Sequence, residues 1–275
     1  MSAAFEMVDT AAEASDYSSP LPNPDSHHLF GIDFHVVRMA DAVEWVMARL
    51  QAADRQCQLV FTPNVDHVVK LRDDLAFRQA YERADLVIAD GWPIVSASRM
   101  LHKTLPARVP GSELVPTVIA SGTTDFRPRV FLLGGAAGVG ERATQRLLAA
   151  HPHLEIVGTD SPPMGFEKSE QESDRIVEKV NQAEPDLLVV GFGAPKQELW
   201  LAAHRDRLRA KVAIAAGATI DFMAGEQTRA PGWIQAMRLE WLHRIATNPR
   251  RLIGRYAKDA IVFPQLVLKE MWTKK

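Results

Sequence analysis

Apolar, β-branched runs alternate with amphipathic stretches along most of the chain after about residue 29. In the amphipathic stretches the apolar residues recur at helical spacing, whereas the apolar runs are short and nearly uninterrupted. Strands that are apolar on both faces are typical of a parallel sheet covered by helices on each side. The pattern therefore predicts an α/β fold. The expected strands are 57–62, 84–90, 129–135, 154–160, 185–193 and 212–218.

Each expected strand is followed by a polar or glycine-rich cluster. The carboxyl ends of parallel strands share one edge of the sheet, and α/β proteins bind ligands there. The sequence thus predicts a crevice lined by six loops, namely 62–66, 90–93, 134–140, 159–166, 191–198 and 217–222.

The last 45 or so residues break this alternation. Residues 229–275 carry ten Lys or Arg against three acids, a balance of +7. Because the net charge of the whole chain is −2, the residues before 229 carry a balance of −9. Trp233, Met237, Trp241 and Ile245 recur every four residues, which indicates an amphipathic helix. A second helix is expected after Pro249, with Pro264 kinking or ending it. We expect a core over 29–228 and a basic helical appendage over 229–275.

Residues 1–28 are acidic and rich in Ser and Pro, without the basic and apolar regions of a signal peptide, and predict a disordered tail. No apolar run reaches the roughly 18 residues that a membrane-spanning helix needs. The single cysteine, Cys57, rules out an intrachain disulfide, suits a reducing cytoplasm and is best interpreted as a small buried residue.

Glycine-rich "LLGGAAGVGERA" (132–143) follows a strand and opens a helix, with Gly134 and Gly135 at its start. Exposed backbone amides there suit a phosphate, but the glycines equally suit tight packing of strand against helix. Asp160, at the end of the next strand, lies where a ribose-binding acid is found in dinucleotide-binding enzymes. An NAD-type oxidoreductase is therefore one alternative.

Polar side chains at other strand ends offer further chemistry. Asp90 is placed as a general base or as a turn-capping residue. Thr62 and Asn64 suit a sugar or phosphate, but are also ordinary helix-starting residues. Arg108 suits a diphosphate or a solvated loop, and Gln197 lies at a helix start that favours anions.

Metal-ligand spacing is absent among the histidines, and no D-x-D pair is present, so neither a metal nor another cofactor is expected. Patterns for acyl transfer or for nucleic-acid recognition are missing as well.

Seven motifs, taken together and in order over about residues 30–262, resemble the WecG/TagA/CpsF family of bacterial glycosyltransferases. They are "TPN" (62–64), "ADGWPIV" (89–95), "RVPGSEL" (108–114), "LGGAAGV" (133–139), "GFGAPKQE" (191–198), "GATIDF" (217–222) and the tail motif "RAPGWIQ…LEWLHRI…NPRRLIGRY" (229–256). The resemblance implies a Rossmann-like domain with a membrane-associating appendage. It also implies metal-independent, inverting transfer of a hexosyl group from a UDP-sugar to a sugar on a polyprenyl diphosphate.

Carried over by motif, the resemblance assigns roles to individual residues. Asp90 matches the catalytic base. The remaining matches are Thr62, Asn64, Arg108 and Gln197 in the substrate pocket, Gly134, Gly135, Phe166 and Asp221 near the nucleotide, and Arg244, Arg251 and Arg255 at the leaving group. Arg238 replaces a usual glycine, and Glu113 stands where Asp is commoner.

The expected partners are a UDP-sugar, a polyprenyl-diphosphate-linked acceptor and the inner face of the cytoplasmic membrane, with self-association possible. The donor sugar stays open among N-acetylmannosamine, its uronic acid and glucose. A non-catalytic nucleotide-binding module that docks on a membrane is a third alternative.

Overall fold

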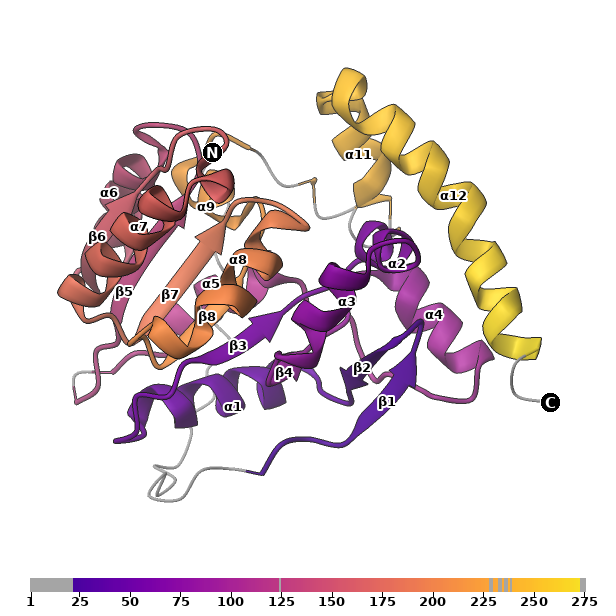
Figure 1. The fold of residues 1–275 in the computed structure, drawn as a ribbon, viewed down its shortest axis with the longest axis horizontal. Helices are drawn as coiled ribbons and strands as arrows, with labels where there is room; N and C mark the ends of the chain where they lie inside the picture. Colours follow the sequence, from indigo (N-terminus) through magenta and orange to yellow (C-terminus); the bar gives the residue numbers. More distant parts are fainter. Residues whose placement is uncertain are drawn as a thin grey trace.

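The predicted parallel sheet is present, and all six expected strands contribute to it (Figure 1). The computed structural model describes residues 22–123, 125–227, 230–231, 234, 237 and 239–272, without the side chain of Arg251. The strand order is β4-β3-β8-β7-β5-β6, and every pair is parallel. The strands are β3 (Gln58–Phe61), β4 (Leu86–Val87), β5 (Arg129–Gly134), β6 (Glu155–Asp160), β7 (Leu187–Gly191) and β8 (Val212–Ala215).

Helices cover both faces of this sheet, which confirms the Rossmann-like α/β fold. Successive strand residues point to opposite faces, so Phe61 and Val60 belong to two different hydrophobic clusters. One cluster includes side chains of α1 (Met39–Gln51), α5 (Gly111–Ala120), α6 (Val139–Ala150) and α9 (Thr219–Ala224). The other includes α2 (Val65–Leu71), α3 (Leu75–Glu82), α4 (Trp92–Met100), α7 (Glu170–Ala183) and α8 (Lys196–His204). Two short 3₁₀ turns, η1 (Phe166–Lys168) and η2 (Arg205–Arg207), complete the core.

A β-hairpin precedes the first helix and corrects the expected boundary of the tail. Strands β1 (Ser26–Leu29) and β2 (Ile32–His35) pair antiparallel through a two-residue turn. Phe30 and Gly31 in the turn both have positive φ, 55° and 85°, the combination that tight hairpins require. Residues 26–28, expected in the tail, therefore form a strand, whereas residues 1–21 lie outside the described part.

The C-terminal helices are α11 (Glu240–Thr247) and α12 (Pro249–Trp272), and α12 packs against the core along α2 (Figure 1). Val262, Phe263 and Val267 are buried in the same hydrophobic cluster as α2 and α8. Of the two outcomes expected for Pro264, a kink or an end of the helix, the second is not found, because α12 continues through this residue. Proline removes one backbone donor, but apolar burial on both sides of it favours keeping the helix intact.

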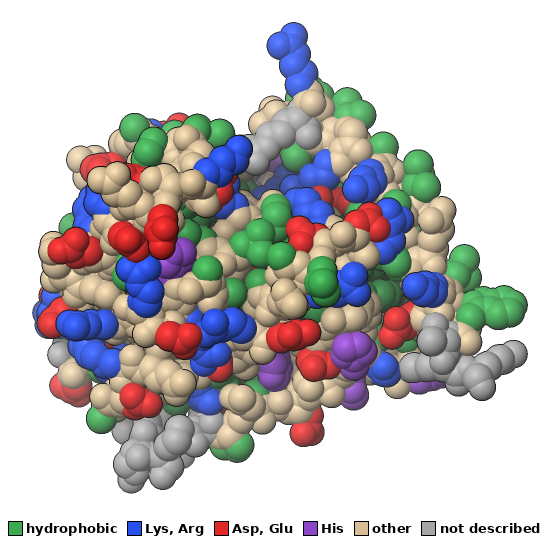
Figure 2. All heavy atoms as spheres, viewed as in Figure 1, with side chains coloured by type: hydrophobic (Ala, Val, Ile, Leu, Met, Phe, Trp, Pro, Cys, Tyr) green, Lys and Arg blue, Asp and Glu red, His purple; other side chains and the backbone are tan. Residues whose placement is uncertain are grey.

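The opposite side of these helices is apolar and exposed. Large apolar side chains there are solvent-accessible, namely Trp241 and Leu242 on α11 and Ile253, Ile261, Leu268, Met271 and Trp272 on α12. Figure 2 shows hydrophobic side chains along the outer edge of the C-terminal helices. Among the described helices, none combines the length and the hydropathy required to cross a bilayer. Trp233 and Arg238 lie outside the described residues.

Candidate active site

A cavity of about 790 Å³ lies at the carboxyl edge of the sheet, between the core and the C-terminal helices. Its wall is formed by the loops after β3, β4, β7 and β8 and by the starts of α5, α11 and α12. Lys and Arg side chains gather around a hollow beside the C-terminal helices in Figure 2. Six of the predicted site residues lie on the wall: Thr62, Asn64, Asp90, Gln197, Arg244 and Arg255.

Asp90 presents a carboxyl group to this cavity from the end of β4. Its backbone N–H donates to the carbonyl of Pro63, 2.9 Å away, which fixes the loop. Gly91 is the N-cap of α4 and no side chain caps that helix, so the capping alternative for Asp90 is not found. Burial raises the pKa of Asp90 to about 7, although the charges of Arg108, Arg244 and His67 lower it. A carboxyl group that titrates near neutrality suits general-base catalysis.

Thr62 and Asn64 have structural contacts as well as places on the cavity wall. The Thr62 hydroxyl donates to the carbonyl of Ala215 on β8, at 3.3 Å. Asn64 is the N-cap of α2, and its Oδ1 accepts the backbone N–H of Asp66 at 3.0 Å. Asn64 therefore caps helix α2, as the helix-starting alternative predicted, and it also lines the cavity.

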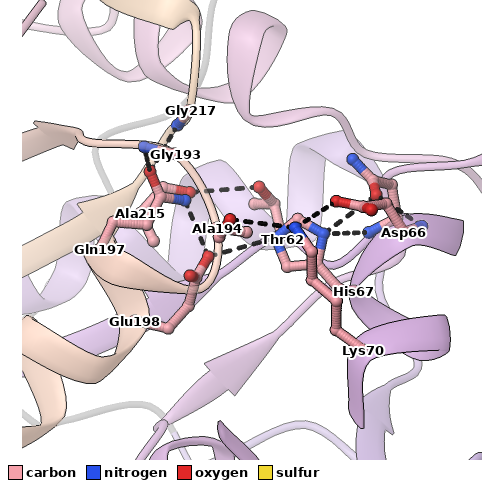
Figure 3. Close-up of polar contacts among 11 residues, drawn as sticks. Thr62, Asp66, His67, Lys70, Gly193, Ala194, Gln197, Glu198, Ala215 and Gly217 are labelled. Carbon is pink, nitrogen blue, oxygen red and sulfur yellow. Dashed lines mark hydrogen bonds and ion pairs between the residues drawn. The ribbon is translucent and has the colours of Figure 1, made fainter. Parts of the chain in front are cut away.

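Gln197 joins two loops of the cavity (Figure 3). Its Oε1 accepts the backbone N–H groups of Gly193 and Gly217, each at 3.1 Å. Its Nε2 donates to Glu198 Oε1 at 2.8 Å. The amide is therefore engaged at both ends and holds the loops after β7 and β8 together.

No functional role was predicted from the sequence for His67 or Glu198, which are paired at the cavity. Glu198 is fully buried behind the cavity wall, and its Oε1 lies 3.2 Å from His67 Nε2. His67 Nδ1 lies 2.9 Å from Asn64 Oδ1, and His67 lines the cavity. Because 131 residues separate the pair, no local pattern indicates it.

Arg108 does not line the cavity itself, but it is held by two carboxylates that do. Nη1 lies 2.9 Å from both Glu240 oxygens, and Nη2 lies 3.0 Å from Glu113 Oε1. Both glutamates line the cavity. The guanidinium therefore connects the loop before α5 to the first residue of α11.

The C-terminal helices bring two arginines to the cavity. Arg244 of α11 lies over the ring of Phe222, 5.6 Å from its centroid. Arg255 of α12 lies 3.5 Å from Asp66 Oδ1, and Lys70 Nζ lies 2.7 Å from Asp66 Oδ2. Asp66 thus holds two cations at this end of the cavity. The Arg251 side chain lies outside the described part.

The predicted nucleotide residues lie beside the cavity and do not line it. A Cβ atom on Gly134 would lie 2.6 Å from the Gly191 carbonyl oxygen, so this glycine permits close approach of the ends of β5 and β7, a contact between two strands and not between strand and helix. Phe166 packs on Phe192 of the cavity wall with centroids 4.5 Å apart. The remaining two are Gly135, whose φ is 78°, and Asp221, whose Oδ2 accepts from Gln227 Nε2 at 3.1 Å.

Asp160, the acid of the dinucleotide alternative, is engaged in ion pairs. Arg175 Nη2 and Lys179 Nζ lie 2.9 Å and 2.5 Å from its two oxygens. It does not line the cavity. Within the described residues, no group of three or more His, Cys, Asp or Glu side chains is arranged to hold a metal ion.

A parallel α/β sheet with a cavity at its carboxyl edge, where Asp90 lies together with Arg244 and Arg255, belongs to the class of α/β proteins that bind ligands at this edge. Residues 27–275 match the profile described as "Glycosyl transferase WecG/TagA/CpsF family". The chain belongs to this family of glycosyltransferases.

Similar proteins include an N-acetylglucosaminyldiphosphoundecaprenol N-acetyl-beta-D-mannosaminyltransferase of Staphylococcus aureus (strain MRSA252). It is 29% identical over 227 residues, which cover 82% of this chain and 86% of that protein. The protein of the same description from strain NCTC 8325 / PS 47 is 28% identical over the same share of each chain.

Proposed function

We propose that the enzyme transfers a hexosyl group from a UDP-sugar to a sugar carried on a polyprenyl diphosphate, with inversion at the anomeric carbon. One observation carries this function: Asp90, with its pKa near 7, shares the cavity with Arg244 of the C-terminal helices. The names of the similar staphylococcal proteins support a lipid-diphosphate acceptor.

Inverting transfer requires one displacement at the anomeric carbon. Asp90 removes the proton of the acceptor hydroxyl as its oxygen attacks that carbon, and the bond from the carbon to the UDP oxygen breaks. The departing diphosphate gains negative charge. Arg244 and Arg255 provide positive charge on the cavity wall for this leaving group, which makes the proposed reaction independent of a metal or another cofactor.

N-acetylmannosamine is the donor sugar that we propose to test first. The similar staphylococcal enzymes are named as N-acetylmannosaminyl transferases that act on N-acetylglucosaminyldiphosphoundecaprenol. The uronic acid of this sugar and glucose, each carried on UDP, are the donors to compare with it, because all three release UDP.

We place the enzyme at the inner face of the cytoplasmic membrane, where a lipid-linked acceptor meets a soluble nucleotide sugar. The exposed apolar side of α11 and α12 supplies contact with the bilayer. Two exposed basic residues of the same helix, Arg250 and Lys258, add attraction to anionic lipid of about 1 kcal/mol each.

The test is a transfer assay with a short-chain lipid-diphosphate-N-acetylglucosamine acceptor. UDP-N-acetylmannosamine should give UDP and a β-linked disaccharide lipid, and Asp90→Asn should remove most of this turnover. A wild-type enzyme that binds no UDP and elongates no lipid-diphosphate acceptor with any of the three donors would refute the proposal.

A further inference from the structure

At the cavity wall, four side chains from the starts of α2 and α8 form one continuous hydrogen-bonded series (Figure 3). The series runs from Asn64 through His67 and Glu198 to Gln197. Asn64, His67 and Gln197 line the cavity, whereas Glu198 has no exposed surface. A buried carboxylate is costly unless it is paired and hydrogen-bonded, so this arrangement needs a physical explanation.

Backbone donors fix the orientation of both amide side chains in the series. Asn64 Oδ1 accepts the N–H of Asp66, so the atom 2.9 Å from His67 Nδ1 is an oxygen. Gln197 Oε1 accepts two backbone N–H groups, so its Nε2 is the group that donates to Glu198 Oε1. Each nitrogen of the His67 ring therefore faces an oxygen that acts as an acceptor.

Only an imidazole with protons on both nitrogens can donate to both oxygens. A neutral ring would bring one nitrogen lone pair against Asn64 Oδ1 at 2.9 Å or against Glu198 Oε1 at 3.2 Å. The backbone N–H of Asn64 would donate to Nδ1 of a neutral ring, but at 3.3 Å this contact is longer than the 2.9 Å contact with Oδ1. The geometry favours an imidazolium paired with the Glu198 carboxylate.

We propose that Glu198 and His67 are positioning residues for this reaction: Glu198 keeps His67 doubly protonated, and His67 orients the Asn64 amide and places positive charge beside Asp90. This inference rests on the proposed function. With Oδ1 occupied twice, the Asn64 Nδ2 group is left to donate to a substrate oxygen in the cavity.

The charged groups around both residues come from several elements. Asp90 is faced by Arg108 from the loop before α5, by Arg244 and Glu240 from α11 and by His67 from α2. His67 is faced by Glu198 from α8 and packs against the ring of Phe77 from α3 at 5.9 Å. Beside Glu198, burial holds the pKa of Tyr81 well above its usual range, so this residue is a neutral phenol.

The test compares Glu198→Gln and His67→Gln with wild type, and uses His35→Gln as a matched control. His35 is a half-buried histidine outside the cavity, whose Nδ1 accepts the backbone N–H of Val87. Nitrogen-15 NMR of the imidazole should show both His67 nitrogens protonated at pH 7 in wild type but not in Glu198→Gln. Melting temperatures establish that each variant is folded.

Turnover gives the second readout. Without the His67 charge, the acid limb of the kcat profile should move to higher pH, with kcat reduced roughly tenfold near pH 6.5 and largely recovered above pH 8. Both cavity variants should show this shift and His35→Gln should not. A neutral His67 ring in wild type, or a wild-type pH profile in both cavity variants, would overturn the inference. If wild type transfers no sugar, the proposed function fails, while the NMR result still decides the pairing.

Discussion

Arg108 Nη1 lies 2.9 Å from each carboxylate oxygen of Glu240, so a loop of the core is joined to the first residue of α11. Arg244 lies one turn further along the same helix and reaches the cavity. This contact therefore anchors the helix that brings a cation to Asp90. The contacts of Arg108 with Glu240 and Glu113 give it a role in docking α11, beside the substrate role that its motif implies.

A double-mutant cycle separates these two roles of Arg108. If Arg108 acts through Glu240, Arg108→Ala and Glu240→Ala should each lower transfer, and the double variant should be little worse than either one. We expect a coupling of about 0.5–3 kcal/mol from kcat/KM. Glu113→Gln, which changes the other partner of the guanidinium, is the control. Strictly additive losses would instead indicate that Arg108 binds substrate.

Ionisation of Asp90 should determine the acid limb of the pH–rate profile. Because a base must be ionised, transfer should rise with pH through about 7, the pKa that burial gives this carboxyl group. Asp90→Asn should reduce kcat by roughly 10²–10⁴, the usual contribution of a general base. The kcat profile between pH 5 and 9 checks both points, and an unchanged kcat in Asp90→Asn would exclude it as the base.

The same carboxyl group should affect stability. The pKa of Asp90 is raised in the folded state from 3.8 to about 7, so the folded protein binds more protons than the unfolded chain between these values. Its contribution to the free energy of unfolding is therefore favourable at acidic pH and is lost as pH rises toward 7. Asp90→Asn should melt higher than wild type at pH 8, with the gain shrinking toward pH 4. Thermal melts across this range test the sign.

Phe263 should couple the C-terminal helices to core stability. Its ring is buried against the core and lies 5.4 Å from the ring of Phe30. Phe263→Ala should lower the free energy of unfolding by about 3–5 kcal/mol, as usual for a buried phenyl group. Ile261→Ala, an exposed neighbour on the same helix, is the control. Denaturant unfolding with equal effects for the two variants would contradict the packing described for α12.

Membrane binding should depend on the exposed apolar side of the C-terminal helices. Trp241→Ser with Trp272→Ser should weaken binding to anionic vesicles, because these side chains are 46% and 75% exposed. Met100→Ser, a 59% exposed apolar residue of the core, serves as the control. Vesicle sedimentation at low and high salt measures both contributions. Unchanged sedimentation of the double tryptophan variant would place the membrane contact elsewhere.

Much of the core was predictable because its signals are local. A strand buried on both faces is apolar throughout, and a helix start changes the period of the pattern. The hairpin before α1 was missed because its strands are four residues each and its turn contains Phe30, a residue that rarely takes positive φ. Proline locally disfavours the interior of a helix, but burial of the apolar residues around Pro264 outweighed this preference in α12.

The sequence by itself determined the six parallel strands, the edge at which their loops meet and the place of Asp90 on that edge, since each depends on a pattern of neighbouring residues. Only the tertiary structure decided which loops line the cavity and what their side chains contact. His67 and Glu198 are 131 residues apart, and Arg108 and Glu240 are 132 apart. Such pairs form because packing of the whole chain brings their elements together. The periodicity of a sequence carries no information about contacts between residues so far apart along the chain.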